Sequence, residues 1–283
     1  MCRMHECRKG QGWLRAASIP SANPANPNRN SVNPRGWKGL LQRWRRPPLP
    51  DGLWHAALDR TPYIRQLAPA DRQRLRELVT EFLHTKTFEG AAGIKVTPPM
   101  RALIALRACV PVLNLGLDWY DGWNSIVLYP TDFRVHEEYE DETGVVHRGQ
   151  ADLCGQSIAQ GPMVLSWETI EHAPAPDQDL VIHECAHKLD TLNGPADGFP
   201  PLHAGMDAAQ WTRDFTAAFD ALNRALEAGT EPRLDPYAAE HPAEFFAVAS
   251  ETFFTEPALL RADFPAVYRQ LSLFYRQEPI ATP

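Results

Sequence analysis

The chain has 283 residues, of which 44% are hydrophobic, enough to build the core of one large domain. Its formal net charge is -7, but residues 1–46 carry ten Lys and Arg against one acid, so +9 there leaves -16 on the remainder. An acidic body argues against direct nucleic-acid binding by the main domain, and the sequence has no run of 18 apolar residues that would suggest a membrane span.

The cysteine usage indicates a reducing compartment. Five cysteines are odd in number and form no CxxC pair, which fits reduced thiols better than a disulfide framework. The N-terminus has scattered basic residues but lacks the apolar stretch of a secretory signal. We therefore expect a cytoplasmic protein.

We expect residues 1–50 to form a disordered basic extension ahead of a domain that spans residues 51–279. The stretch 21–28 (SANPANPN) is rich in Asn and Pro and has almost nothing to bury. Trp37 and Trp44 lie among Lys and Arg residues, which is also typical of a basic amphipathic turn that contacts a membrane surface or an acidic partner. A disordered tail, or a start codon assigned too early, is the simpler interpretation.

The first part of the domain has helical periodicity. Apolar residues recur at helical spacing between Asp71 and Phe88, which predicts a helix over that range. A second helix is predicted from Thr97, because Thr is a good N-cap and Pro is tolerated in the first turn. Its apolar run predicts burial, so Cys109 is expected to be a small core residue.

Between Trp123 and Trp167 the pattern changes to short strands bounded by Gly and Pro. The acidic run 137–142 predicts a solvated hairpin or loop. Three strands are predicted, at 126–129, 145–147 and 163–167.

The run VIHECAHKLD at 181–190 contains H-E-x-x-H. On a helix, His183 and His187 lie one above the other and aim both imidazoles at one point. Neutral imidazole suits Zn²⁺, and a catalytic zinc needs three protein ligands and an open position for water. Glu184 projects beside that position, where it can take a proton from the water.

The surroundings of the motif favour a buried helix. Asp177 or Asp179 can cap its start, and Asn193 with the following Gly and Pro ends it. A helix that merely exposes two histidines and a glutamate to solvent is the alternative, but the neighbouring residues are too apolar for an exposed helix.

The segments after this helix alternate between loops and helices. A Gly- and Pro-containing loop over 193–203 is a candidate rim of a substrate cleft. Further helices are predicted at 207–228, 242–254 and 262–275.

The third ligand must come from elsewhere in the chain. A third His six residues after His187 is absent, because that position is Asn193. A carboxylate on a later helix is the other common solution. Glu240 precedes a proline and is expected in a loop, whereas Glu244 and Glu251 are seven residues apart and share one helix face.

We assign Glu244 to the metal and Glu251 to a hydrogen bond with a ligand imidazole. The alternative is that both carboxylates cap the helix or form surface salt bridges. His241 is expected to be a loop residue.

Three motifs together resemble the Mlc titration factor A family of bacterial zinc metallopeptidases. They are LNLGLDWYDG at 113–122, HECAHKLD at 183–190 and PAEFFAVASE at 242–251, and the resemblance covers roughly residues 55–279. The family fold is similar to the catalytic core of anthrax lethal factor. The resemblance therefore implies an α+β fold: a mostly helical zincin-type metallopeptidase domain with a small sheet.

The resemblance also implies roles for individual residues. It implies that His183, His187 and Glu244 bind one Zn²⁺ ion and that Glu184 is the general base. It points to His147 as a residue that can approach the metal in a resting form, although the residues alone suggest an ordinary strand histidine. It matches Tyr237 to a tyrosine near the active site, where a phenol can donate to a developing oxyanion; a packed loop tyrosine is the alternative.

The predicted function is a zinc-dependent, aminopeptidase-like enzyme that acts on peptide substrates. The founding family member binds the glucose repressor Mlc, so the resemblance also implies a transcriptional repressor of that type as a partner. The alternative is a non-catalytic protein that titrates the repressor and keeps a structural or vestigial zinc site.

Overall fold

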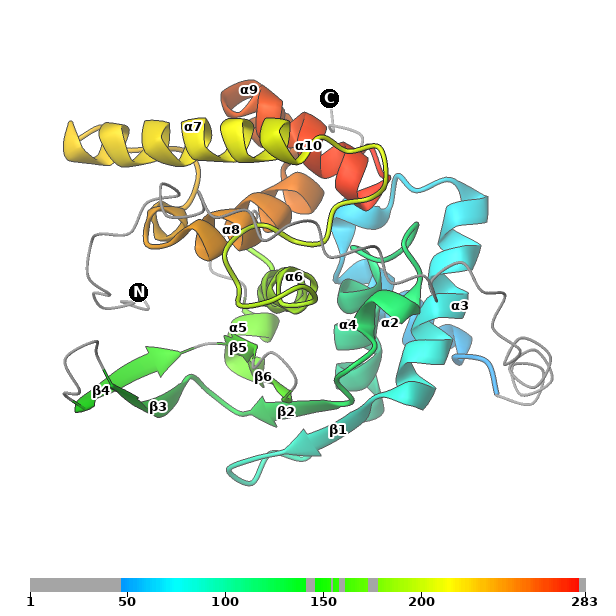
Figure 1. Ribbon diagram of the computed structural model, residues 1–283. Coiled ribbons are helices and arrows are strands. Elements are labelled where there is room, and N and C mark those ends of the chain that lie inside the picture. Colours follow the sequence, from blue (N-terminus) through cyan, green and yellow to red (C-terminus); the bar gives the residue numbers. More distant parts are fainter. Residues whose placement is uncertain (1–46, 141–145, 154, 158–160, 173–177, 280–283) are drawn as a thin grey trace.

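Helix α6 (Leu180–Asp190) lies at the centre of the molecule, between a small sheet and a layer of C-terminal helices (Figure 1). This arrangement comes from a computed structural model. It describes residues 47–140, 146–153, 155–157, 161–172 and 178–279. Between residues 133 and 157 it describes the backbone alone, and elsewhere it describes the side chains as well. Residues 1–46 lie outside the described residues, so the expected N-terminal extension stays a prediction.

The sheet below α6 has the order β1-β2-β6-β5. β1, β2 and β6 run parallel, and the edge strand β5 pairs antiparallel with β6. The predicted strands at 126–129 and 163–167 are β2 and β6. The bounds of the four strands are β1 Thr87–Gly90, β2 Ser125–Tyr129, β5 Gly155–Ser157 and β6 Met163–Ser166.

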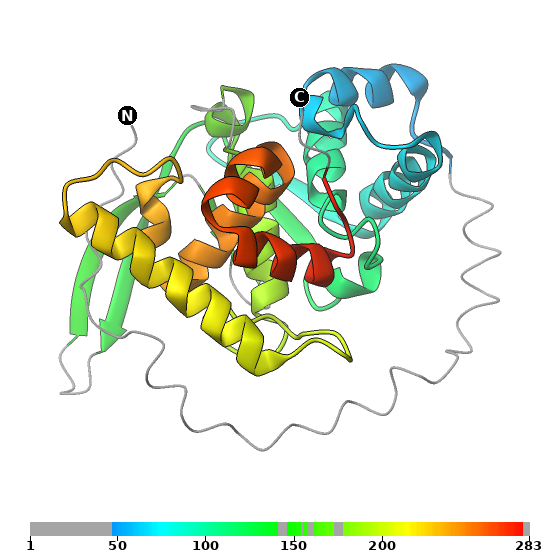
Figure 2. The same ribbon diagram turned by 90° about the horizontal axis from the view of Figure 1, so that it is seen from above.

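A separate antiparallel hairpin consists of β3 (Phe133–Glu140) and β4 (Val146–Leu153). It extends from the side of the molecule opposite α3, as both views show (Figure 2). The acidic run that starts at Glu137 begins in β3. Of the two structures predicted for this run, a hairpin or a loop, the structure has the hairpin.

The N-terminal helices cover one flank of α6. The helix predicted over 71–88 is too long: α3 ends at Thr85, and Phe88 lies in β1. The reason is Lys86, which adopts an extended conformation and donates from its buried ammonium to the carbonyl of Tyr120, 2.7 Å away. The elements of this layer are α2 Asp51–Asp59, η3 Pro62–Ile64, α3 Pro69–Thr85, α4 Pro98–Cys109 and η4 Leu117–Tyr120.

The C-terminal helices cover the other side. The single helix predicted over 262–275 is two helices that meet at Phe264, because Pro265 cannot donate the backbone hydrogen bond that a continuous helix needs. The predicted strand 163–167 ends at Ser166, whose hydroxyl caps the short helix α5 (Trp167–Glu171) beside the sheet (Figure 1). The elements of the C-terminal layer are α7 Ala208–Glu227, η5 Pro236–Ala239, α8 Pro242–Thr255, α9 Pro257–Asp263 and α10 Pro265–Tyr275.

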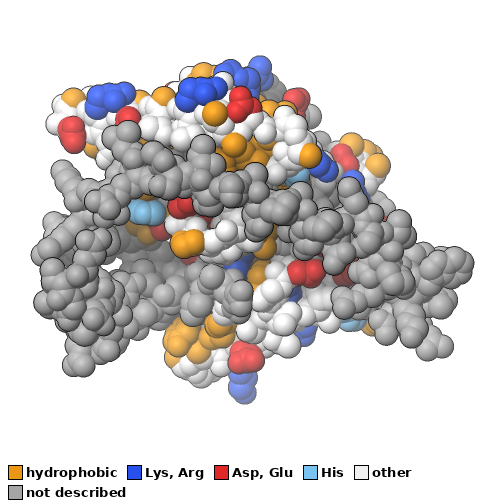
Figure 3. Space-filling view, viewed as in Figure 1, with side chains coloured by type: hydrophobic (Ala, Val, Ile, Leu, Met, Phe, Trp, Pro, Cys, Tyr) orange, Lys and Arg blue, Asp and Glu red, His pale blue; other side chains and the backbone are white. Residues whose placement is uncertain are grey.

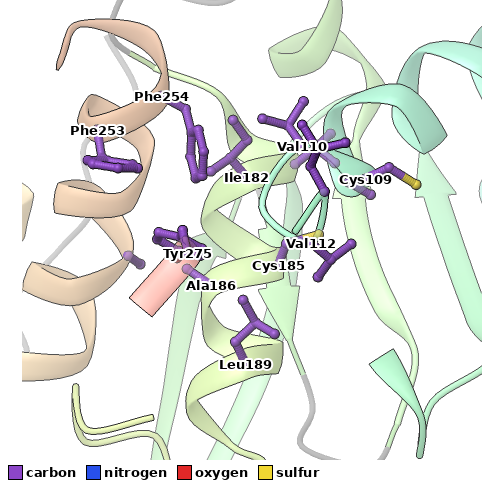
Figure 4. Close-up of a cluster of buried hydrophobic side chains, with 14 of the residues drawn as sticks. Cys109, Val110, Val112, Ile182, Cys185, Ala186, Leu189, Phe253, Phe254 and Tyr275 are labelled. Carbon is purple, nitrogen blue, oxygen red and sulfur yellow. The ribbon is translucent and has the colours of Figure 1, made fainter. Parts of the chain in front are cut away.

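The core surrounds α6 on two sides (Figure 4). Ile182, Cys185, Ala186 and Leu189 point away from the helix axis into this core and are all fully buried. Side chains of α8 and α10 pack on one side of the helix, and the end of α4 with the turn after it packs on the other, where Cys109 is buried as predicted. The flanking residues are Cys109, Val110, Val112, Phe253, Phe254 and Tyr275.

Helix α8 is almost entirely buried, with Glu244 and Thr255 the exceptions among the residues from 242 to 255. A helix that is apolar on all sides belongs in a core, and α8 packs directly against α6.

The outer surface carries charges of both signs. In Figure 3 Lys and Arg side chains lie along the upper helices with acidic side chains between them. Within the described residues, no helix is long and apolar enough to cross a membrane.

Candidate metal centre

Three side chains on two helices converge on one point. The Nε2 atoms of His183 and His187 lie 3.1 Å apart, and Glu244 Oε2 lies 3.1 Å from the first and 3.3 Å from the second. Helical spacing brings the two histidines of α6 together, and the packing of α8 against α6 adds the carboxylate. These are the three residues predicted as ligands.

The histidines do not face open solvent. His183 is 9% exposed and Glu184 is 3% exposed, so the alternative of a solvent-facing motif is excluded. Asp179, one of the two predicted caps, caps the start of α6, since its Oδ1 accepts hydrogen bonds from the amides of Val181 and Ile182.

Glu251 orients the first histidine. Its Oε1 lies 2.5 Å from His183 Nδ1, and its Oε2 accepts a hydrogen bond from the Asp179 amide at 2.8 Å. With Nδ1 donating to this carboxylate, Nε2 faces His187 and Glu244, so the neutral form of His183 presents its lone pair to the point where a metal ion would bind. Glu251 therefore makes the contact predicted for it, with the nitrogen of His183 that does not face Glu244.

The electrostatics of the cluster follow from burial and proximity. Burial lowers the pKa of His183, but the carboxylates of Glu251 and Glu244 outweigh it and hold that pKa well above its usual range. Burial alone would raise the pKa of Glu244, yet the two imidazoles hold it far below its usual range. Burial raises the pKa of Glu184 to about 7. The carboxylates thus favour positive charge at the point where the donor atoms meet.

These donors fit a divalent metal ion. Two imidazoles and one carboxylate, with all three ligand atoms within 4.8 Å of one another, match the donor set of a catalytic zinc with an open position. Three buried side-chain atoms of α6, Glu184 Oε2, His187 Nδ1 and Asp190 Oδ1, have no hydrogen-bond partner among the described residues. Buried polar groups normally have partners, so Glu184 Oε2, on the residue that follows the first histidine of the cluster, is available to a group that binds at this site.

Tyr237 lies close to the cluster. Its ring centroid is 6.1 Å from that of His183, and its backbone amide donates to Asp235 Oδ1 at 2.9 Å. Asp235 also accepts a hydrogen bond from Gln178, two residues before α6, so the turn that carries Tyr237 is tied to that helix. The sequence offered no indication of this link.

Two other residues named from the sequence have the local positions expected of them. His147 lies in β4 opposite Tyr139, but its side chain lies outside the described residues, so its approach to the metal stays a prediction. His241 is the N-cap of α8: its Nδ1 accepts a hydrogen bond from the Ala243 amide at 3.1 Å. It is therefore a capping residue next to the site.

Comparison with known proteins agrees with this geometry. A family model described as "Glucose-regulated metallo-peptidase M90" matches residues 37–276, and so begins inside the predicted extension. Proteins named Mlc titration factor A, from Yersinia pestis (strain Pestoides F) and Yersinia pseudotuberculosis (serotype O:1b, strain IP 31758), are each 43% identical over 232 residues. Each alignment covers 81% of this chain and 85% of the relative. The chain therefore belongs to the glucose-regulated metallopeptidase family M90, which includes the Mlc titration factor A proteins.

Proposed function

We propose that this protein is a zinc-dependent, aminopeptidase-like peptidase. The observation that carries the proposal is the meeting of His183, His187 and Glu244 donor atoms within 3.1–3.3 Å beside a buried glutamate that follows the first histidine. This combination of ligands with an acid–base group is typical of enzymes that hydrolyse peptides with a metal.

The protein residues divide the remaining work. Zn²⁺ held by the three donors would polarise the scissile carbonyl and lower the pKa of water. Glu184 accepts the proton of the attacking water and returns it to the leaving amine. Tyr237 donates its phenolic hydrogen to the oxygen that develops negative charge. Glu251 holds the His183 ring in one orientation throughout.

The test is the variant Glu184→Gln, which keeps the shape of the side chain but cannot act as a base. We expect it to retain zinc, measured by metal analysis, and to lose at least about 10²-fold in the hydrolysis of aminoacyl and peptide anilides. Glu227→Gln, an exposed change at the end of α7, is the matched control. Retained activity of Glu184→Gln in a clean, metal-replete preparation would overturn the catalytic proposal.

A second proposed function is suggested by the relatives' name, Mlc titration factor A. We infer that this chain binds a transcriptional repressor of the Mlc type in the cytoplasm. A low-turnover peptidase can do both. If purified protein binds such a repressor, continues to bind it after zinc is removed, and hydrolyses no anilide with or without a chelator, the non-catalytic alternative is correct.

A further inference from the structure

A buried chain of contacts connects the N-terminal layer to the candidate metal centre. Asp179 is its central residue and is 2% exposed. Its Oδ1 caps α6, while its Oδ2 accepts a hydrogen bond from the Tyr63 hydroxyl at 2.6 Å and forms an ion pair with Arg107 Nε at 3.3 Å. The carboxylate thus faces two ways, toward its own helix and toward η3 and α4.

The main chain of the same residue continues this connection. The Asp179 amide donates to Glu251 Oε2 at 2.8 Å, and Glu251 Oε1 lies 2.5 Å from His183 Nδ1. A shift of Asp179 therefore moves the carboxylate that orients a metal-ligand imidazole. A simple helix cap would act on α6 alone, whereas Asp179 also acts on α8.

The Asp179 carboxylate has one positively charged partner and one hydrogen-bond donor in the N-terminal layer. Arg107 is 7% exposed and places a permanent positive charge beside the buried carboxylate of Asp179. Its Nη2 also donates to the Arg60 carbonyl at 3.0 Å, which fixes the guanidinium. Burial and the Asp179 carboxylate raise the pKa of Tyr63 well above its usual range, so its hydroxyl stays protonated and donates. Removing either partner leaves a buried carboxylate less well satisfied.

We propose that Tyr63, Arg107 and Asp179 are positioning residues for the metal centre, which act on His183 through Glu251. This inference rests on the proposed zinc site. Tyr63 lies 116 residues before Asp179 in the chain, so the N-terminal layer sets the geometry of a site built on α6 and α8.

The experiment measures Zn²⁺ affinity by competition with a chromogenic chelator, and the stability of the metal-free protein by urea unfolding. Tyr63→Phe should weaken Zn²⁺ binding by roughly 3- to 10-fold, less than the ~10- to 100-fold expected for direct partners of ligands. Asp179→Asn keeps a good N-cap residue but loses the second carboxylate oxygen, and should weaken Zn²⁺ binding at least as much.

Tyr275→Phe is the matched control. Its hydroxyl is buried and donates to Ser250 Oγ at 2.8 Å, on the same helix as Glu251, but the described contacts do not connect it to His183. We expect it to lower stability without changing Zn²⁺ affinity. In the double variant Tyr63→Phe/Glu251→Gln, the loss of Zn²⁺ binding free energy should be smaller than the sum of the losses in the two single variants, because both residues act through the same contacts.

The outcomes separate the two proposals. If the unmodified protein binds Zn²⁺ and Tyr63→Phe binds it equally well, the positioning role is wrong while the zinc site stands. Additive effects in the double variant would likewise overturn the path through Glu251. If the unmodified protein binds no Zn²⁺, the proposed function fails and the positioning role fails with it.

Discussion

Glu251 and His183 are joined by a 2.5 Å contact between Oε1 and Nδ1, although 68 residues separate them in the chain. The contact leaves His183 Nε2 directed toward Glu244 Oε2, 3.1 Å away. Because a ligand imidazole is only as well oriented as the group behind it, Glu251 is expected to control metal affinity.

Glu251→Ala should therefore weaken Zn²⁺ binding by about 10- to 100-fold, as is typical when a carboxylate behind a ligand histidine is lost. The measurement is competition with a chelator at fixed pH. Glu240→Ala is the control: Glu240 is an exposed acid on the segment just before α8, and its removal should leave the affinity unchanged. An equal effect of the two variants would contradict the role of Glu251.

Removal of the metal should lower the melting temperature. An ion that binds only the folded protein stabilises it by about 4 kcal/mol at a free concentration 1,000-fold above its Kd. We expect a chelator to lower the melting temperature by several degrees in scanning calorimetry. His187→Ala, which removes one of the three donors, should reduce this chelator-dependent shift. A shift of the same size in that variant would place the ion elsewhere.

Asp235 offers a way to disturb Tyr237 without touching a ligand. Its carboxylate accepts hydrogen bonds from the Tyr237 amide at 2.9 Å and from Gln178 Nε2 at 2.6 Å. Asp235→Ala should lower kcat by roughly 10- to 10²-fold, because a displaced donor stabilises the transition state less well. Zn²⁺ affinity should stay unchanged. Asp235→Asn keeps one acceptor oxygen, so its kcat should lie between those of the unmodified protein and Asp235→Ala.

Asp190 predicts a pH dependence of stability. Burial raises the pKa of its carboxyl to about 7 in the folded protein, although the Gly198 amide donates to it at 2.8 Å and works against the shift. The usual value in an unfolded chain is about 3.9. The folded state therefore holds this proton more tightly. The resulting stability is fully present below about pH 4 and is lost as the pH rises through about 7.

The test is urea unfolding at pH 5 and pH 8, with a chelator present so that metal binding adds no pH dependence. Each pKa unit of difference corresponds to about 1.4 kcal/mol, so the unmodified protein should lose up to a few kcal/mol over this range. Asp190→Asn should lose less, and the exposed change Asp118→Asn should behave like the unmodified protein. Equal slopes for Asp190→Asn and the unmodified protein would contradict this explanation.

Local patterns were sufficient for the helices that carry the site. The H-E-x-x-H spacing, an apolar stripe and a capping aspartate are all properties of neighbouring residues, and α6 formed as they predict. The same holds for α8, where Pro242 stands at the first turn. Patterns failed where a distant contact prevailed, as at Lys86, whose buried ammonium binds carbonyl oxygens near β2 and ends the preceding helix early.

Spacing alone named His183, Glu184 and His187, because one turn of helix relates them. For the third donor the sequence placed Glu240 in a loop and favoured Glu244 on the helix. Only the packing of α8 against α6 shows that Glu244 meets both imidazoles and that Glu251 contacts the other nitrogen of His183. The contacts of Tyr63 and Arg107 with Asp179 had no local signal at all. Helix periodicity acts over a few residues and is visible in the sequence, whereas these contacts join segments tens of residues apart and arise only when the layers pack.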